Sequence, residues 1–188
     1  MKKSLTTIIK PFGKALQGIA FWVSYNKMYF NNHKLQEAPI TLEFCKLLQS
    51  NFTDGQNVFQ EEMLKKIYHS DVKTMERVDL LIKDKNRKEL FAIEFKTDVS
   101  GAKIDADINK LLKIKLARPD ITCYLIVVLE KSHNKRFIDN KGVAVKKIIK
   151  IKNTIGFYKV RRVCKSIASF NLEKTYKANY ALLIEVFI

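Results

Sequence analysis

Residues 121–129 read Ile-Thr-Cys-Tyr-Leu-Ile-Val-Val-Leu, an almost wholly apolar run without a charged side chain. A strand of this composition has to be covered on both faces, as at the centre of a mixed sheet with helices around it. The preceding residues favour such a helix, because apolar side chains recur at helical spacing over 104–116. Together these runs predict an α/β fold with a mixed central sheet flanked by helices, in three layers at most.

Two shorter apolar runs lie ahead of this helix and predict an antiparallel hairpin. Residues 77–82 form a short β-rich run, and residues 89–95 alternate apolar side chains with Ala92 and Glu94. The polar residues 83–88 join the two runs as a turn. The sequence therefore places two paired strands directly before the helix and the buried strand.

The remaining elements are predicted with less detail. Residues 12–30 have the spacing of an amphipathic helix, and a second helix is expected from Thr41, as its cap after Pro39, to about Gln49. Residues 58–68 fit either a strand or a helix, and residues 181–188 are expected to form a final strand.

A single domain is expected over residues 1–188, because the chain has no repeat and no Gly/Ser- or Pro-rich linker. We expect a helical N-terminal part over about 1–50, a core over about 51–130 and a basic C-terminal part over about 131–188. Three widely spaced cysteines without a CxxC motif argue against a structural zinc site and for reduced thiols.

The sequence also bears on location. Lys10, Pro11 and Lys14 interrupt the N-terminal apolar stretch, which is therefore not typical of an export signal. The later run over residues 19–23 is far shorter than the roughly 20 apolar residues that cross a bilayer. We therefore expect a cytoplasmic protein without a membrane partner.

Charge is the first indication of function. The chain has 35 Lys and Arg residues against 19 Asp and Glu, a formal net charge of +16. Such an excess attracts polyanions, so the candidate partners are nucleic acid, an anionic membrane surface or an acidic protein. Basic residues in the C-terminal part are expected to contact phosphates, although a solvated lysine-rich surface is the alternative. The candidates are Lys131, Lys135, Arg136, Lys146, Lys147, Arg161 and Arg162.

The hairpin carries the residues that point to chemistry. Side chains of a strand alternate faces, so Glu94 and Lys96 point the same way while the apolar residues between and around them face the core. Asp79 reaches the same place if it lies across from Glu94 on the neighbouring strand, since facing Cβ atoms are about 5 Å apart. The hairpin would then hold two acids and an amine together on one rigid surface.

Two carboxylates at that separation repel each other unless a cation lies between them. Oxygen ligands favour a hard divalent ion, Mg²⁺ or Mn²⁺, and the backbone carbonyl of Phe95 could supply another oxygen. A bound ion of this kind acidifies water and neutralises phosphate charge, which is what phosphodiester hydrolysis requires. Lys96 would lie beside the attacking water, where it could orient or deprotonate that water or stabilise the transition state.

Asp79, followed across the hairpin by Glu94-Phe95-Lys96, resembles the motif of the PD-(D/E)XK nuclease superfamily, which includes many restriction endonucleases and repair nucleases. The resemblance covers roughly residues 37–129, with Val78 standing where the motif has proline. It implies a restriction-endonuclease-like fold. It also implies a further acid on the helix before the hairpin, for which Glu43 is the best-placed residue and Glu61 or Glu62 the alternative.

These patterns together predict a divalent-metal-dependent endonuclease that hydrolyses DNA, and the resemblance implies a bacterial restriction or defence role. The expected catalytic residues are Asp79, Glu94, Lys96 and Glu43, with Asp79, Glu94 and the Phe95 carbonyl as ligands of Mg²⁺ or Mn²⁺. Double-stranded DNA is the expected substrate, and cleavage of both strands would suit a homodimer. The alternatives are a non-catalytic basic nucleic-acid-binding module and an RNA-cleaving toxin on the same fold.

Overall fold

The computed structural model describes residues 5–29, 36–52, 56–63, 67, 76–86, 88–97, 101–129, 134–166 and 178–188. Within these residues, seven strands form one sheet in the order β1-β2-β3-β4-β7-β6-β5. The strands are β1 (Asn57–Met63), β2 (Arg77–Lys83), β3 (Glu89–Lys96), β4 (Thr122–Leu129), β5 (Ile149–Lys150), β6 (Phe157–Ser166) and β7 (Asn179–Phe187). The helices are α1 (Leu5–Tyr29), α2 (Glu37–Gln49) and α4 (Gly101–Ala117).

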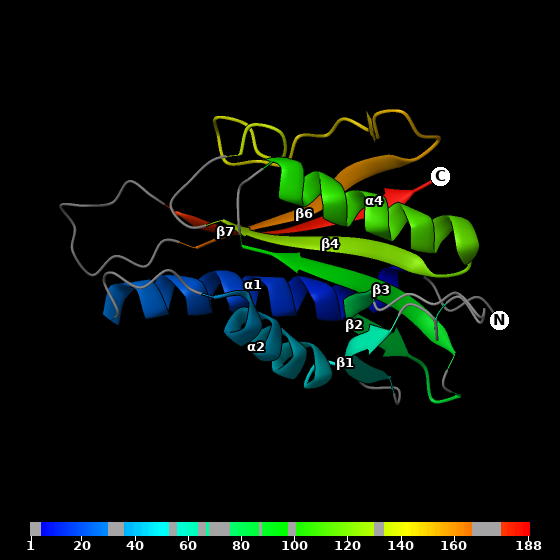
Figure 1. Ribbon diagram of the computed structural model, residues 1–188. Coiled ribbons are helices and arrows are strands. Elements are labelled where there is room, and N and C mark those ends of the chain that lie inside the picture. The colour runs from blue at the N-terminus through cyan, green and yellow to red at the C-terminus, as the bar shows by residue number, and fades with distance from the viewer. Residues whose placement is uncertain are drawn as a thin grey trace.

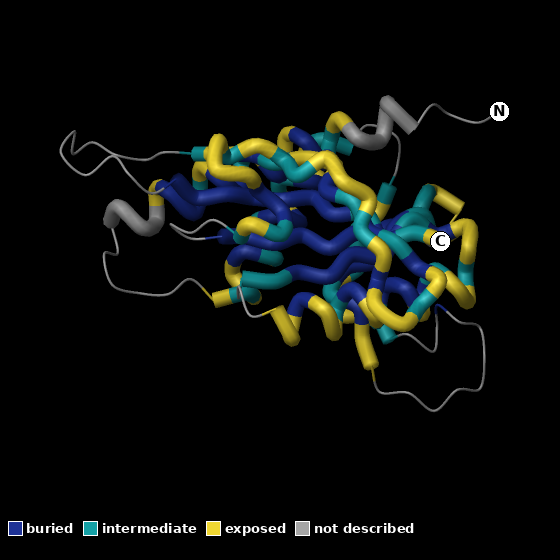
Figure 2. The backbone as a smooth tube through the Cα atoms, turned by 90° about the horizontal axis from the view of Figure 1, so that it is seen from above, coloured by how far each residue is buried: buried dark blue, intermediate teal, exposed yellow. Residues whose placement is uncertain are grey.

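The sheet lies between two helical layers. Helices α1 and α2 cover one face and α4 covers the other (Figure 1). The apolar core is divided accordingly: Phe12 and Phe44 pack with Phe95 on the first face, whereas Ile108 packs with Leu125 on the second. Figure 2, which views the molecule from above, shows long stretches of buried backbone in dark blue. The predicted α/β architecture, a mixed sheet flanked by helices in three layers, is therefore confirmed.

Strand β4 occupies the position that its composition predicted. It runs parallel to β3 and antiparallel to β7, and residues 123–129 are all buried. The final strand predicted over 181–188 is β7, which lies inside the sheet between β4 and β6. Because α1 packs against β6 and β7, the N-terminal and C-terminal parts of the chain share one core.

The predicted hairpin is formed by β2 and β3. Leu80, Leu81 and Ile82 of β2 pair with Ile93, Ala92 and Phe91 of β3. Leu81 and Ala92 belong to the core under α4, while Leu80 and Ile93 belong to the core under α1 and α2. Continuing this register by one residue places Asp79 opposite Glu94, on the α4 face of the sheet.

Helix α2 differs from its prediction in a way that matters for the site. It begins at Glu37, with Gln36 as its N-cap, and not at Thr41. Pro39 lies in the first turn, where its missing N–H costs nothing because that donor has no intrahelical acceptor. The hydroxyl of Thr41 therefore donates to the backbone oxygen of Glu37, 3.0 Å away, and does not cap the helix.

Two other regions refine the predictions. The ambiguous run 58–68 contains β1, which ends at Met63, and residues 64–66 and 68 lie outside the described residues. Helix α1 begins well before residue 12 and continues through Pro11. Among the described helices, none combines the length and the apolar character needed to cross a membrane.

Candidate active site

Asp79 is fixed against the backbone of β3. Its Oδ2 atom accepts a hydrogen bond of 2.6 Å from the backbone N–H of Phe95. The last paired residues of β2 and β3 at this end are Leu80 and Ile93. Beyond them, the side chain of Asp79 binds the backbone of β3. Since the N–H and C=O of one strand residue point to the same side, the Phe95 carbonyl also faces the Asp79 side of β3.

Glu94 is the buried carboxylate of the site. Only 3% of its side chain is exposed, and its Oε1 atom lies 2.7 Å from Nζ of Lys110 on α4. Burial, followed by repulsion from Asp79, raises the pKa of Glu94 to about 8, against the opposing attraction of Lys110. This distance is that of a charge-assisted hydrogen bond, so Lys110 is the partner of Oε1. Glu94 therefore holds a proton or a nearby cation at neutral pH.

Lys96 lies between the two helical layers at the end of β3. Its Nζ atom is 3.1 Å from Asp107 Oδ2 on α4 and 3.5 Å from Glu37 Oε2 at the start of α2. Burial lowers the pKa of Lys96, but hydrogen bonding and attraction from Asp107 and Glu37 outweigh that effect and raise it. The amine is thus held as an ammonium group by Asp107 and Glu37, two residues along β3 from Glu94.

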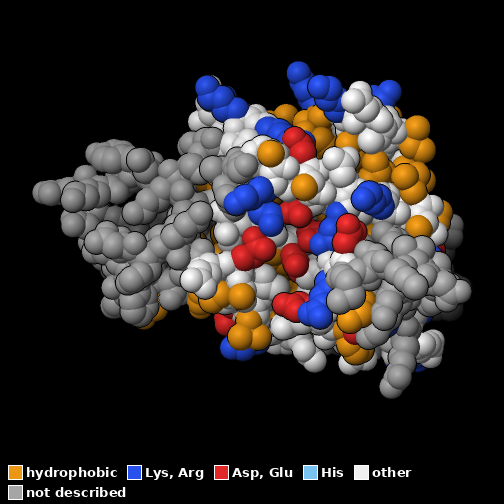
Figure 3. Space-filling view, in the orientation of Figure 1, with side chains coloured by type: hydrophobic (Ala, Val, Ile, Leu, Met, Phe, Trp, Pro, Cys, Tyr) orange, Lys and Arg blue, Asp and Glu red, His pale blue; other side chains and the backbone are white. Residues whose placement is uncertain are grey.

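Glu37 and Asp107 complete a cluster of four acids and two lysines. Burial raises the pKa of both, and repulsion from Asp79 adds to each shift, while Lys96 opposes it. Oδ2 of Asp107, like Oε1 of Glu94, is buried and lies against a lysine ammonium. In the view of Figure 3, acidic side chains gather in the middle of the molecular surface, with Lys and Arg side chains among them.

Glu43, the acid expected on the helix before the hairpin, lies elsewhere on α2. It forms an ion pair of 3.8 Å with Lys46. Six residues separate Glu43 from Glu37, which puts the two side chains roughly 120° apart around the helix. Glu61 on β1 pairs with Arg77, at 2.9 Å, and Glu62 is its neighbour on the same edge strand. The structure therefore brings Glu37 to Lys96 in place of these three acids.

Sequence reasoning missed Glu37, Asp107 and Lys110. Pro39 was a signal for the first, because proline is favoured in the first turn and a start before it brings Glu37 into the helix. Asp107 and Lys110 are three residues apart and so share one side of α4, beside its apolar stripe. A solvated ion pair on a helix surface has the same spacing. Only the packing of α4 on β3 therefore shows that Asp107 and Lys110 belong to the cluster.

The donor chemistry of the cluster fits a hard divalent ion. Within the described residues, no three acidic, histidine or cysteine side chains stand close enough together to hold a metal ion. Asp79 and Glu94 nevertheless repel each other, and Lys110 is the cation that lies against the buried Oε1 of Glu94. Carboxylate and carbonyl oxygens are the ligands that Mg²⁺ and Mn²⁺ prefer. Asp79, Glu94 and the Phe95 carbonyl are the groups that would hold such an ion.

The predicted phosphate-contacting residues are not gathered in one place. Lys135, Lys146 and Lys147 are exposed on the segment 134–156, which lies on the α4 side of the sheet (Figure 1). Arg136 of this segment is held by Asp105 and Tyr158. The remaining three candidates lie elsewhere. Arg161 pairs with Glu185, and Arg162 lies against Gly13 of α1. Lys131 lies outside the described residues.

Comparison with protein-family models, with curated proteins and with solved structures finds no match to this chain. The function therefore has to be argued from the geometry of the cluster and from the motif that Asp79, Glu94 and Lys96 form.

Proposed function

We propose that this chain is a divalent-metal-dependent nuclease whose active site is the cluster around the β2–β3 hairpin. The observation that carries the proposal is the buried carboxylate of Glu94, whose pKa is raised to about 8 beside Asp79. A chain that only needed a stable sheet would gain nothing from burying an acid next to another acid, because both charges lose hydration. Strongly perturbed acids of this kind are typical of functional sites.

Each residue has a role that follows from its position. Asp79 and Glu94 would bind the metal, which when present supplies acidity to water and positive charge to the phosphoryl oxygens. Lys96 is held as an ammonium by Asp107 and Glu37, so it is suited to orient water and to stabilise negative charge on the phosphate. Its raised pKa makes the alternative role, removal of a proton from water, the weaker one.

DNA is the substrate that we propose, with a bacterial restriction or defence role, as the resemblance implies, and a cytoplasmic location. The net charge of +16 supports a polyanionic substrate, since phosphate contacts dominate the affinity of such complexes. Cleavage of both strands of a duplex would suit a homodimer, in which each subunit supplies one active site.

The test is cleavage of supercoiled plasmid and of structured RNA by the full chain, with Mg²⁺, with Mn²⁺ and with EDTA. Metal-dependent nicking or linearisation of the plasmid supports the proposal. Cleavage of RNA alone would instead identify an RNA-cleaving toxin, and the DNA assignment would fail.

A second candidate is a basic nucleic-acid-binding module without catalysis. The pairing of Glu94 with Lys110 favours it, because that ammonium already supplies the positive charge that the carboxylate needs. Binding of DNA without cleavage under any of the metal conditions would support this reading and overturn the nuclease proposal.

A further inference from the structure

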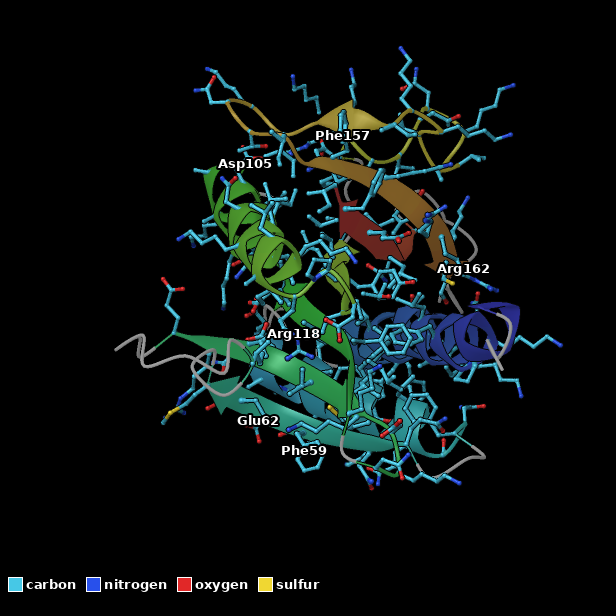
Figure 4. The ribbon with its side chains drawn as sticks, turned by 90° about the vertical axis from the view of Figure 1, so that its right-hand side faces the viewer. Phe59, Glu62, Asp105, Arg118, Phe157 and Arg162 are labelled. Atoms are coloured by element: carbon cyan, nitrogen blue, oxygen red, sulfur yellow. The ribbon has the colours of Figure 1, made fainter. Side chains whose placement is uncertain are left out.

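A pocket of about 440 Å³ lies on the other side of α4 from Glu94. It is lined by Asp105 and Asn109 of α4, by Arg136 and Tyr158, and by residues 150–153. Asp105 and Asn109 are one helical turn apart and face away from the side of α4 that carries Asp107 and Lys110. Figure 4 shows Asp105 at the end of α4 that approaches the segment 134–156, with Arg118 at its opposite end.

Arg136 is held in one orientation on the wall of this pocket. Its Nε donates to the hydroxyl of Tyr158 at 2.6 Å, and its Nη1 lies 2.7 Å from Asp105 Oδ1. The guanidinium also lies over the rings of Phe137 and Tyr158, at 5.2 and 4.8 Å from their centroids. These contacts use two of the five N–H donors of Arg136. The guanidinium is therefore already oriented, and its other N–H groups remain for a ligand.

The opposite wall is a turn that packs tightly against α4. The N–H of Ile151 donates to the carbonyl of Gly156 at 2.9 Å, and Asn153 between them has a left-handed φ of 58°. A Cβ at Gly156 would lie 2.4 Å from a methyl carbon of Leu112, so any larger residue there would require the Leu112 side chain to move. The turn thereby presents Lys150 and Lys152, both exposed, to the pocket.

The charges of the pocket favour an anion. Arg136, Lys150 and Lys152 contribute three positive charges, and Asp105, already paired with Arg136, contributes one negative charge. The amides of Asn109 and Asn153 add neutral groups that can donate hydrogen bonds. Planar recognition by an arginine fork together with lysine point charges is the usual chemistry of phosphate binding.

We propose that this pocket binds a phosphate group of a nucleic-acid strand, across α4 from the cluster of Glu94 and Lys96. A strand is favoured over a free nucleotide because exposed Lys135, Lys146 and Lys147 extend the positive charge along the same segment. The inference rests on the proposed function for its substrate. It adds a second contact with the strand, at a distance from the hairpin.

The test compares two double variants that remove the same charge from different faces of the molecule. Lys150→Gln/Lys152→Gln changes the pocket, whereas Lys10→Gln/Lys14→Gln changes two exposed lysines of α1, which covers the other face of the sheet (Figure 1). Affinity for a short labelled DNA duplex is measured by fluorescence anisotropy in EDTA, over a range of salt concentrations. Inorganic phosphate and a mononucleotide are titrated against the wild-type protein as separate probes.

We expect the pocket variant to bind the duplex about tenfold more weakly than the control variant, with a salt slope that is smaller by about 1 to 2. Equal losses in the two variants would overturn the proposal. Binding of the mononucleotide or of phosphate as tightly as the duplex would also overturn it, by assigning the pocket to a free ligand. Because binding is read in EDTA, a wild-type protein that binds at this pocket but never cleaves would contradict only the nuclease proposal.

Discussion

The ammonium of Lys110 lies 2.7 Å from Oε1 of Glu94, a carboxylate of which only 3% is exposed. The pair joins α4 to the end of β3, just beyond the last residues paired with β2, and lies beside a second contact between Asp107 and Lys96. Two acids and two lysines are thus paired crosswise between a helix and a strand. In the proposed nuclease, a metal held by Glu94 and Asp79 has to replace the charge that Lys110 now supplies.

Replacement of Lys110 tests what this ion pair contributes. At a pH above about 8, where Glu94 is ionised, Lys110→Met leaves the buried carboxylate without its counter-charge, and we expect the free energy of unfolding to fall by about 1–3 kcal/mol. Lys113→Met is the matched control, because Lys113 is exposed on the same helix. Chemical denaturation of both variants in EDTA measures the difference. Equal stabilities would show that Lys110 does not compensate the charge of Glu94.

The raised pKa of Glu94 predicts a specific dependence of stability on pH. The pKa is about 8 in the folded protein against an ordinary value of 4.5, so the folded state binds more protons between these limits. The free energy of unfolding should therefore fall as pH rises from about 4.5 to about 8, and then level off. Each pKa unit corresponds to about 1.4 kcal/mol, so the total change is a few kcal/mol at most.

Glu94→Gln isolates this effect, because glutamine cannot ionise while Glu37 and Asp107 remain. The difference in unfolding free energy between wild type and variant, measured in EDTA across that pH range, should change with the sign given above. A difference that does not vary with pH would mean that Glu94 is ionised throughout.

The position of Glu37 predicts a contrast with Glu43 on the same helix. Glu37 contacts the ammonium of Lys96, whereas Glu43 pairs with Lys46. Glu37→Gln should lower the cleavage rate by about 10- to 100-fold, as is usual for residues that orient a catalytic group. Glu43→Gln should leave the rate unchanged. If the Glu43 variant loses activity and the Glu37 variant keeps it, the assignment made from the sequence is the correct one.

Lys96→Ala should reduce cleavage by about two to four orders of magnitude, because the charge beside the reacting phosphate is lost. Binding of DNA in EDTA should remain within a few-fold of wild type, since Lys96 is one cation among 35 Lys and Arg residues. Gel-based cleavage and anisotropy binding on the same preparation separate the two quantities. Normal cleavage by this variant would exclude Lys96 from the chemistry.

The central part of the fold could be predicted because its residues allow few alternatives. An apolar run such as 121–129 has to lie inside a sheet, and acids within otherwise apolar strands stand out at Asp79 and Glu94. Strand β6 could not be predicted in this way. Its residues alternate poorly, with Arg161 and Arg162 adjacent, and the register shift between Val160 and Arg162 breaks the two-residue period.

The residues that complete the candidate site depend on packing between elements. Asp107 and Lys110 become part of it only because α4 lies over β3. The local sequence specifies this packing far less than it specifies the strands themselves. Glu37 is hard to predict for a different reason: Thr41 is a favoured helix cap, whereas the first turn of a helix also tolerates Pro39, so the sequence fits a start at either residue.

The most direct test of the account is a crystal structure of the protein with Mn²⁺, in which anomalous scattering locates the metal. The account predicts one anomalous peak that is bound by the carboxylates of Asp79 and Glu94 and by the carbonyl of Phe95, with Lys110 displaced from Glu94. A protein saturated with Mn²⁺ in which Lys110 still pairs with Glu94, and in which no peak lies between the two acids, would contradict it.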